Sequence, residues 1–324
     1  MTPLTIDPAV RTRFRRRNRA QTLALGVGAV LLLCLCAFAI AGGDGVLWAL
    51  IGGSFAVWLA TRVSPQIVLG LYGARELAPA EDARAHMIVR LLSERAGLSA
   101  VPRLFQVPSR LMNAFSSGRP DDAVICVTDG LLTRMSSREL VAVLAHEIAH
   151  VAHGDILVMA LADVVSRMTT VMSMLGLFLA FFNLPSLIEG REGAPFAIIA
   201  ALLVAPALGT LLQLALSRTR EFDADLGAAE LTGDPEGLAL ALTRLDRMQG
   251  RMWEAVLPTG ARTPDPSVLR THPRTEERIE RLMALKASPD RWIDDKGHPH
   301  VRARSPIPDA GRPRHRLRGL GLWH

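Results

Sequence analysis

An unbroken run of uncharged residues from Gln21 to Gly43 constrains this chain more than any other feature of its sequence. The run is rich in Leu, Ala, Val and Cys, and as a helix it is long enough to cross about 30 Å of hydrocarbon. A second charge-free run, Gly45 to Thr61, follows after a very short turn. We therefore predict a transmembrane hairpin over residues 21–63. The alternative is a cleaved signal peptide, because a basic segment and small residues such as Ala37 and Ala39 accompany the first run.

Basic residues flank the hairpin on both sides, whereas its turn has none. The positive-inside rule therefore places both flanks in the cytoplasm. The formal net charge is +6, almost all from Arg, which suits anionic lipid headgroups as readily as nucleic acid. The flanking residues are Arg11, Arg13, Arg15, Arg16, Arg17 and Arg19 before the first run and Arg62 and Arg75 after the second.

Two further apolar runs follow later in the chain. Ala194 to Ser217 has no charge, and Ile156 to Phe182 is apolar apart from Asp163 and Arg167, which are four residues apart and can pair on one helical face. These runs are candidate third and fourth spans. The alternative is a pair of buried core helices in a soluble domain.

The remaining segments indicate a mostly helical α+β protein with about four transmembrane helices. Residues 1–20 form a basic N-terminal segment, residues 64–154 and 218–287 form two parts of one soluble lobe, and residues 155–217 hold the later spans. Residues 288–324 are basic and Pro-rich and favour disorder. The expected elements are helices over Pro79–Ala96, Glu221–Leu231, Pro235–Met248 and Thr275–Leu285, a strand over Arg103–Val107, and an alternating run over Ala123–Thr128.

Several kinds of site and partner are disfavoured. The three cysteines, Cys34, Cys36 and Cys126, provide neither a disulfide framework nor a thiolate zinc site. The basic tail lacks interleaved aromatic residues apart from Trp292 and Trp323, so we expect no nucleic-acid partner.

The sequence His146-Glu147-Ile148-Ala149-His150 is a candidate zinc motif. Imidazoles four residues apart project from one face of a helix about one turn apart, a spacing at which both can bind one tetrahedral Zn²⁺. In H-E-x-x-H enzymes the Glu does not bind metal; it takes a proton from the attacking water and passes it to the leaving amine. The alternative is an incidental helix with two surface histidines.

A catalytic zinc needs a third protein ligand. Glu221 is a candidate, and Asp225, one turn further along, can orient a ligating His. The alternative is an Arg-rich helix at the membrane interface with exposed ion pairs. His153 also lies on the face of His150, but about 7 to 8 Å along the helix from the expected metal position. His150 and Glu221 can bind the same metal ion only if the chain between them crosses the membrane an even number of times. Two apolar runs lie between them, as this requires.

Several motifs in one order give the chain a resemblance to the HtpX-type membrane metallopeptidases, relatives of the CAAX prenyl endopeptidase. The likeness extends from the first span to about Leu285. The matching pieces are Tyr72-Gly73-Ala74-Arg75, Asn113-Ala114-Phe115 with Gly118, Thr128-Asp129-Gly130-Leu131-Leu132, His146 to His150 with Gly154-Asp155, Ser217 to Asp225, and Thr271-His272-Pro273 with Arg278.

The resemblance implies a gluzincin fold and one zinc ion per subunit on His146, His150 and Glu221, with Glu147 as the base and Asp225 supporting a ligand. It implies that Asn113 and Ala114 hold substrate backbone along an edge strand. It also implies that His272 stabilises the oxyanion, with Arg278 nearby.

The implied function is hydrolysis of peptide bonds in membrane or misfolded proteins, as proteolytic quality control. The implied location is the bacterial inner membrane, with the peptidase domain facing the cytoplasm; the oligomeric state stays open. One rival function is a catalytically silent scaffold or signalling subunit that retains a zinc site. A purely structural zinc site has no need of Glu147, so the presence of this residue argues against that rival. Another is an antibiotic-sensing transducer, which needs a large extracellular sensor.

Overall fold

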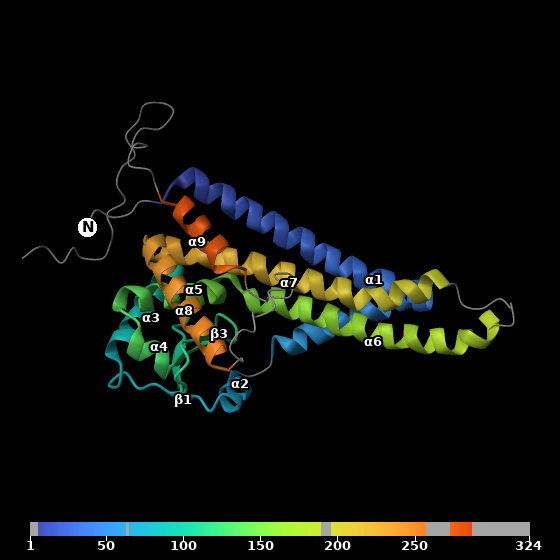
Figure 1. The fold of residues 1–324 in the computed structure, drawn as a ribbon, viewed down its shortest axis with the longest axis horizontal. Coiled ribbons are helices and arrows are strands. Elements are labelled where there is room, and N and C mark those ends of the chain that lie inside the picture. The colour runs from blue at the N-terminus through green and yellow to red at the C-terminus, as the bar shows by residue number, and fades with distance from the viewer. Residues whose placement is uncertain (1–5, 63–64, 189–195, 257–272, 287–324) are drawn as a thin grey trace, which may run out of the picture.

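The computed structural model describes residues 6–62, 65–188, 196–256 and 273–286. Within these residues it contains nine helices and one four-stranded sheet, which confirms the predicted mostly helical α+β fold. Three long helices, α1, α6 and α7, extend from a lobe that holds the sheet and the shorter helices (Figure 1). The predicted tail over residues 288–324 lies outside the described residues.

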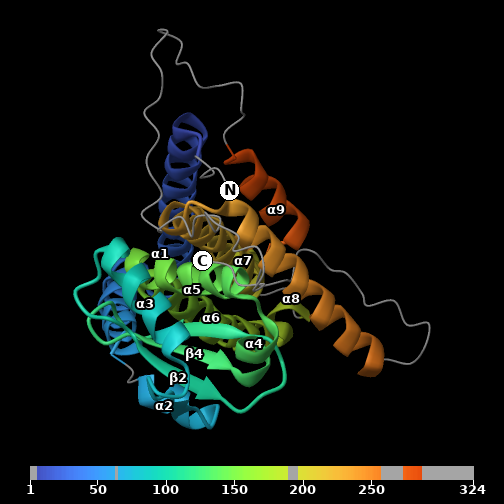
Figure 2. The ribbon, with the colours of Figure 1, turned by 90° about the vertical axis from the view of Figure 1, so that its left-hand side faces the viewer.

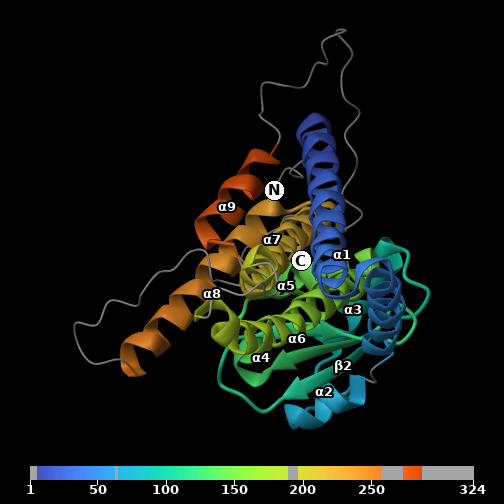
Figure 3. The same ribbon diagram turned by 90° about the vertical axis from the view of Figure 1, so that its right-hand side faces the viewer.

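Helix α1, Pro8–Ala60, contains both runs of the predicted hairpin. The Asp7 side chain caps its start, and the backbone leaves helical geometry at Ala41 and Gly42, where Gly42 has a φ of 59°. The chain turns back there, so the two legs lie as neighbouring blue helices (Figure 3). They pack through small and apolar residues of both legs, namely Ala29, Leu33, Ala37 and Ala49.

Helix α6, Asp155–Ile188, contains the third apolar run, and helix α7, Phe196–Thr232, contains the described part of the fourth. Large apolar side chains on them stay exposed; Val171 and Phe178, for example, are 61% and 63% exposed. A soluble core helix would bury such residues, so this exposure favours membrane spans. Among the described residues, α1, α6 and α7 are the three helices long and apolar enough to cross a membrane.

Helix α7 continues through Thr232 without a break, so the helix predicted from Glu221 is its C-terminal part. The predicted boundary between residues 217 and 218 therefore falls inside one helix. One continuous helix thus leads from the apolar run directly to Glu221.

The sheet has the order β1-β2-β4-β3. Strand β2 lies over Arg103–Val107, as predicted, and pairs in parallel with β4, Val124–Thr128, and antiparallel with β1, Arg75–Glu76. Strand β3, Ala114–Ser117, pairs antiparallel with β4 at the sheet edge. The residue pattern did not indicate this strand, whereas the resemblance implied an edge strand at Asn113 and Ala114.

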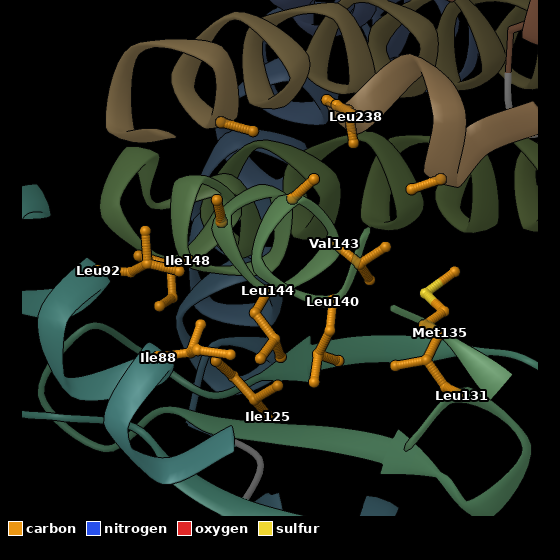
Figure 4. Packing of buried hydrophobic residues seen from close by; sticks show 14 of the residues in the cluster. Ile88, Leu92, Ile125, Leu131, Met135, Leu140, Val143, Leu144, Ile148 and Leu238 are labelled. Atoms are coloured by element: carbon orange, nitrogen blue, oxygen red, sulfur yellow. The ribbon is translucent and has the colours of Figure 1, made fainter. Parts of the chain in front are cut away.

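Helix α5, Ser137–His153, lies across one face of this sheet and forms the centre of the lobe. Its fully buried residues Leu140, Leu144 and Ile148 recur every four positions, and they point toward Ile125 of β4 and Ile88 of α3 (Figure 4). Helix α3 is Ala83–Ala96; it begins four residues later than predicted because Asp82 caps it by accepting a hydrogen bond from the Ala85 amide.

The opposite side of α5 is covered by α7 and by α8, Pro235–Val256 (Figure 2). Helix α9, Thr275–Ala284, packs against α8. Short helices α2, Pro65–Leu71, and α4, Asp129–Arg134, complete the lobe. Helix α5 is therefore packed on both sides, which fixes the direction of the histidines it holds.

Candidate metal centre and cleft

Helix α5 has defined ends, which set the register of its histidines. Ser136 and Glu139 form a capping box at its start, and Gly154, with a φ of 65°, ends it in a left-handed conformation. Because Leu140, Leu144 and Ile148 occupy the side facing the sheet, His146 and His150 point to the other side. His146 and Glu147 are only 9% and 8% exposed.

Helix α7 approaches α5 closely beside the histidines. A Cβ built on Gly227 would lie 2.8 Å from the Ala149 Cβ and 3.0 Å from His153 Cε1. Glycine at this position therefore permits the short distance between the two helices. That distance brings Glu221 and Asp225 of α7 to the imidazoles of α5.

His146, His150 and Glu221 form a group that can hold a metal ion. The two Nε2 atoms are 3.1 Å apart, and the Glu221 carboxylate oxygens lie 3.5 Å from Nε2 of His146 and 3.9 Å from Nε2 of His150. Ligand atoms of a tetrahedral zinc site, with bonds of about 2.0 to 2.1 Å, stand roughly 3.3 Å apart. The donor set and its spacing therefore fit zinc.

His146 is supported from behind by an ionic network. Its Nδ1 lies 3.1 Å from Asp225 Oδ1, and Arg278 donates two hydrogen bonds to the Asp225 carboxylate, at 2.8 and 2.6 Å. Arg278 Nη1 also lies 3.1 Å from Glu221 Oε2. Burial would raise the pKa of Asp225, but the Arg278 guanidinium lowers it below its usual value. Asp225 therefore stays ionised behind His146.

His150 has an equivalent support that sequence reasoning did not assign. Its Nδ1 lies 2.6 Å from Asp155 Oδ2, and Arg220 Nε donates to Asp155 Oδ1 at 2.6 Å. An ionised carboxylate can only accept, so Nδ1 bears the proton and Nε2 turns its lone pair toward the shared metal position. Asp155 directly follows Gly154, the residue that ends α5. A carboxylate at this position, about one turn beyond His150, was the sequence signal that could have indicated its role.

Replacing Asp155 with Asn is expected to weaken metal binding by about 10- to 100-fold, because the carboxylate that orients His150 loses its charge. Competition with a coloured chelator measures this affinity. Asp122→Asn is the control, since Asp122 forms an exposed ion pair with Arg103 away from the site. An Asp155→Asn protein with the affinity of the wild type would remove Asp155 from the metal centre.

Glu147 lies beside the metal ligands and faces the same cleft. Ser116 of β3 donates a hydrogen bond from Oγ to Glu147 Oε2 at 2.9 Å, which holds the carboxylate toward the strand. The cleft has a volume of about 610 Å³. Its lining comes from β3, from α5 and the start of α6, from α7, and from α8 and α9, and it includes residues 113–118, His146, Glu147, His150, Ile156, Met159, Glu221, Leu238, Leu242 and Arg278.

Asn113 and Ala114 lie in this cleft, at the start of the edge strand. Thr128 fixes them, because its backbone amide donates to the Asn113 carbonyl at 3.0 Å and its Oγ1 accepts from the Asn113 amide at 2.9 Å. A Cβ on Gly130 would lie 2.2 Å from the Arg110 carbonyl oxygen, so the loop before β3 passes too close for any side chain there. The turn after β4 thus positions β3.

The positions of two other candidate histidines differ in how they can be assessed. His272 lies outside the described residues, although its neighbour Pro273 lines the cleft. His153 Nδ1 lies 3.8 Å from Asp223 Oδ2, away from the metal ligands, as its axial position on the helix predicted.

Comparison with known proteins relates the chain to peptidases. Residues 79–286 match the family described as Peptidase family M48. A protease HtpX homolog of Paraburkholderia phytofirmans is 36% identical over 267 residues, covering 74% of this chain and 91% of that protein. A protease HtpX homolog of Ralstonia pickettii is 35% identical over 264 residues, covering 76% and 89%.

The crystal structure of S. mikatae Ste24p is also similar, at 22% identity and a TM-score of 0.45. The match covers 83% of this chain and 66% of that one, slightly less than two thirds of its length. The sequence matches are the stronger of these findings.

Proposed function

This chain belongs to peptidase family M48, and we propose that it uses one zinc ion per subunit, held by His146, His150 and Glu221, to cleave polypeptides beside a membrane. It is a membrane metalloprotease that hydrolyses peptide bonds. One observation supports the proposed site above others: both imidazoles, the Glu221 carboxylate and Glu147 converge on one cleft.

Two histidines and one glutamate leave a fourth position of a tetrahedral zinc site open. When bound, zinc would act as a Lewis acid toward the substrate carbonyl and make water more acidic. Arg278 and Asp225 hold Glu221 and His146 in place for that ion, and Asp155 holds His150. The ligands are thus oriented in advance by charged neighbours.

Glu147 acts as the general base in this proposal. Its carboxylate takes a proton from the attacking water and passes it to the nitrogen of the leaving amine, so the amine departs neutral. The hydrogen bond from Ser116 restrains the carboxylate between the metal ligands and the strand. Removing that bond leaves the base less well oriented but still present.

The substrate backbone is proposed to lie along β3, beginning at Asn113 and Ala114, as an added strand. Strand β3 pairs with β4 on one side only, and its residues line the cleft. Ser116 of this strand hydrogen-bonds to Glu147, so a peptide lying along β3 would pass close to the proposed base. His272 is proposed to stabilise the oxyanion that forms on the scissile carbonyl. Arg278, already bound to Asp225 and Glu221, holds ligands rather than substrate.

The proposed substrates are membrane or misfolded proteins, degraded in quality control at the bacterial inner membrane. The basic residues on both sides of the α1 hairpin support an orientation with the lobe in the cytoplasm. A catalytically silent scaffold that retains zinc is the alternative, and the retained Glu147 speaks against it.

Removal of the metal is expected to abolish cleavage of fluorescent casein by the protein in detergent. Adding one equivalent of Zn²⁺ to the stripped protein should restore the rate, because the ligands belong to a folded site. Circular dichroism shows whether the stripped protein stays folded. Casein cleavage that persists in folded, metal-free protein would reject the mechanism.

A further inference from the structure

One face of α6 leads from the cleft into the apolar bundle. Ile156 and Met159, near the start of α6, line the cleft. An α-helix turns by about 100° per residue, so Asp163 and Arg167 fall on the same face as Met159. Further along, this face continues with Thr170, Met174 and Phe178. We call the set Ile156, Met159, Asp163, Arg167, Thr170, Met174 and Phe178 the outer face of α6.

The outer face points away from the other long helices. The opposite side of α6 is buried, with Val165 at 1% and Thr169 at 0% exposure. Val165 packs with the α1 hairpin, and Thr169 Oγ1 lies 3.0 Å from a Cβ built on Gly209 of α7. On the outer face, by contrast, the Arg167 side chain is 78% exposed and Phe178 is 63% exposed.

The charges on this face lie deep within the apolar spans. Met168, next to Arg167, has its Sδ 3.6 Å from a Cβ built on Gly53, and Leu33 lies at the same distance from that point. Gly53 and Leu33 are near the centres of the two charge-free runs of α1. Asp163 and Arg167 are therefore at membrane depth, where charged groups are costly and, for that reason, usually mark a functional site.

The two residues form an ion pair in which Arg167 Nε donates to Asp163 Oδ2 at 2.7 Å. The pair is neutral as a whole, yet a guanidinium has five N–H donors and a carboxylate several acceptor positions. It can therefore bond to both N–H and C=O groups of another chain. A peptide that leaves helical conformation inside a membrane exposes both kinds of group, and each needs a partner there.

We propose that the outer face of α6 is a docking surface for the membrane segment of a protein substrate, and that Asp163 and Arg167 bond to its backbone as it unwinds toward the cleft. The proposal rests on the proposed proteolytic function and names how membrane substrates reach the same site. A substrate is the occupant, rather than a second copy of this chain, because the face continues without interruption into residues that line the cleft.

The test uses the full-length protein in lipid vesicles with two substrates: fluorescent casein and a single-span reporter protein whose apolar segment is interrupted by Asn and Gly. The variant Asp163→Leu with Arg167→Leu removes the pair without a change in net charge. We expect casein cleavage to stay within about twofold of wild type and reporter cleavage to fall about tenfold. A fall of about tenfold is the effect expected from losing one or two polar contacts within a membrane.

A matched variant, Asp163→Arg with Arg167→Asp, keeps the pair in reversed order and should restore reporter cleavage. Equal reporter cleavage by wild type and the double-Leu variant would overturn the proposal. An equal fall in casein and reporter cleavage by the double-Leu variant would also overturn it, because such a fall would assign the ion pair a structural role. A change from dimer to monomer in the double-Leu variant, measured by mass photometry, would assign the face to self-association instead.

A second readout does not depend on cleavage. In the Glu147→Gln background, a photo-crosslinking amino acid at Met174 should capture the reporter, whereas one at Leu203, an exposed position on α7, should not. Replacing Asp163 and Arg167 by Leu should reduce capture at Met174. If wild type fails to cleave casein while this capture persists, the proposed function fails and the docking surface stands. Equal capture at both positions, or undiminished capture by the double-Leu protein, would overturn the docking surface.

Discussion

Replacing Glu147 with Gln is expected to slow casein cleavage by about 10²- to 10⁴-fold, the contribution typical of a general base. Gln has nearly the size of Glu, and its amide oxygen can still accept the hydrogen bond from Ser116 Oγ. It cannot take a proton from water, so the fall should appear mainly in kcat. Metal content, measured by mass spectrometry of the purified protein, should stay at one ion per chain.

Glu76→Gln is the matched control, because Glu76 is an exposed carboxylate on β1, away from the cleft. It should cleave casein at the wild-type rate. A Glu147→Gln protein that also cleaves at the wild-type rate would require another base and would refute the assigned mechanism. Loss of metal from Glu147→Gln would instead make Glu147 part of the metal centre.

Replacing Glu221 with Ala is expected to lower metal affinity by more than about 100-fold, beyond the range for residues that only orient a ligand. The change removes one of three protein ligands. It also leaves the positive charge of Arg278, whose Nη1 lies 3.1 Å from Glu221 Oε2, paired among the described residues with Asp225 alone, and this charge would then repel a cation more strongly. Dialysis against a competing chelator, followed by metal analysis, measures the loss.

Glu230→Gln is the control on the same helix, since Glu230 pairs with Arg15 at a distance from the cleft. Thermal unfolding of both proteins separates metal loss from misfolding. Retention of metal by a folded Glu221→Ala protein would show that a different side chain completes the site.

Local spacing was enough to predict the elements that hold the metal group. The interval between His146 and His150 matches one helical turn, and the apolar residues Leu140 and Leu144 indicate which side of that helix is buried. Asp225 lies one helical turn beyond Glu221, so the same spacing predicted that both carboxylates are on one face of their helix. Each of these inferences concerns residues within one helix, where the backbone geometry is regular.

The contacts that connect different elements could not be predicted in this way. Arg220 reaches Asp155 across an interval of 65 residues, and Ser116 reaches Glu147 from a neighbouring strand. The residue pattern did not indicate strand β3, because its four residues, Ala-Phe-Ser-Ser, form a short segment with no alternation of apolar and polar residues. The close crossing at Gly227 depends on how α5 and α7 pack, which no local pattern specifies.

The long helices illustrate the same distinction. Long apolar runs predicted the membrane-spanning segments, because length and a low content of charged residues are properties of a single segment. The continuation of α7 from its apolar run through Glu221 was not predicted, since the change from apolar to charged residues suggested a boundary. Helical structure persisted there because the charged residues have partners on α5, α6 and α9.

The position of the metal is the central claim, and anomalous X-ray diffraction at the zinc absorption edge tests it most directly. Crystals of the purified protein, loaded with one equivalent of Zn²⁺, should give one strong anomalous peak per chain, within about 2.0 to 2.2 Å of His146 Nε2, His150 Nε2 and a Glu221 carboxylate oxygen. A peak at any other group of residues, or none at this group in protein that cleaves casein, would contradict the account.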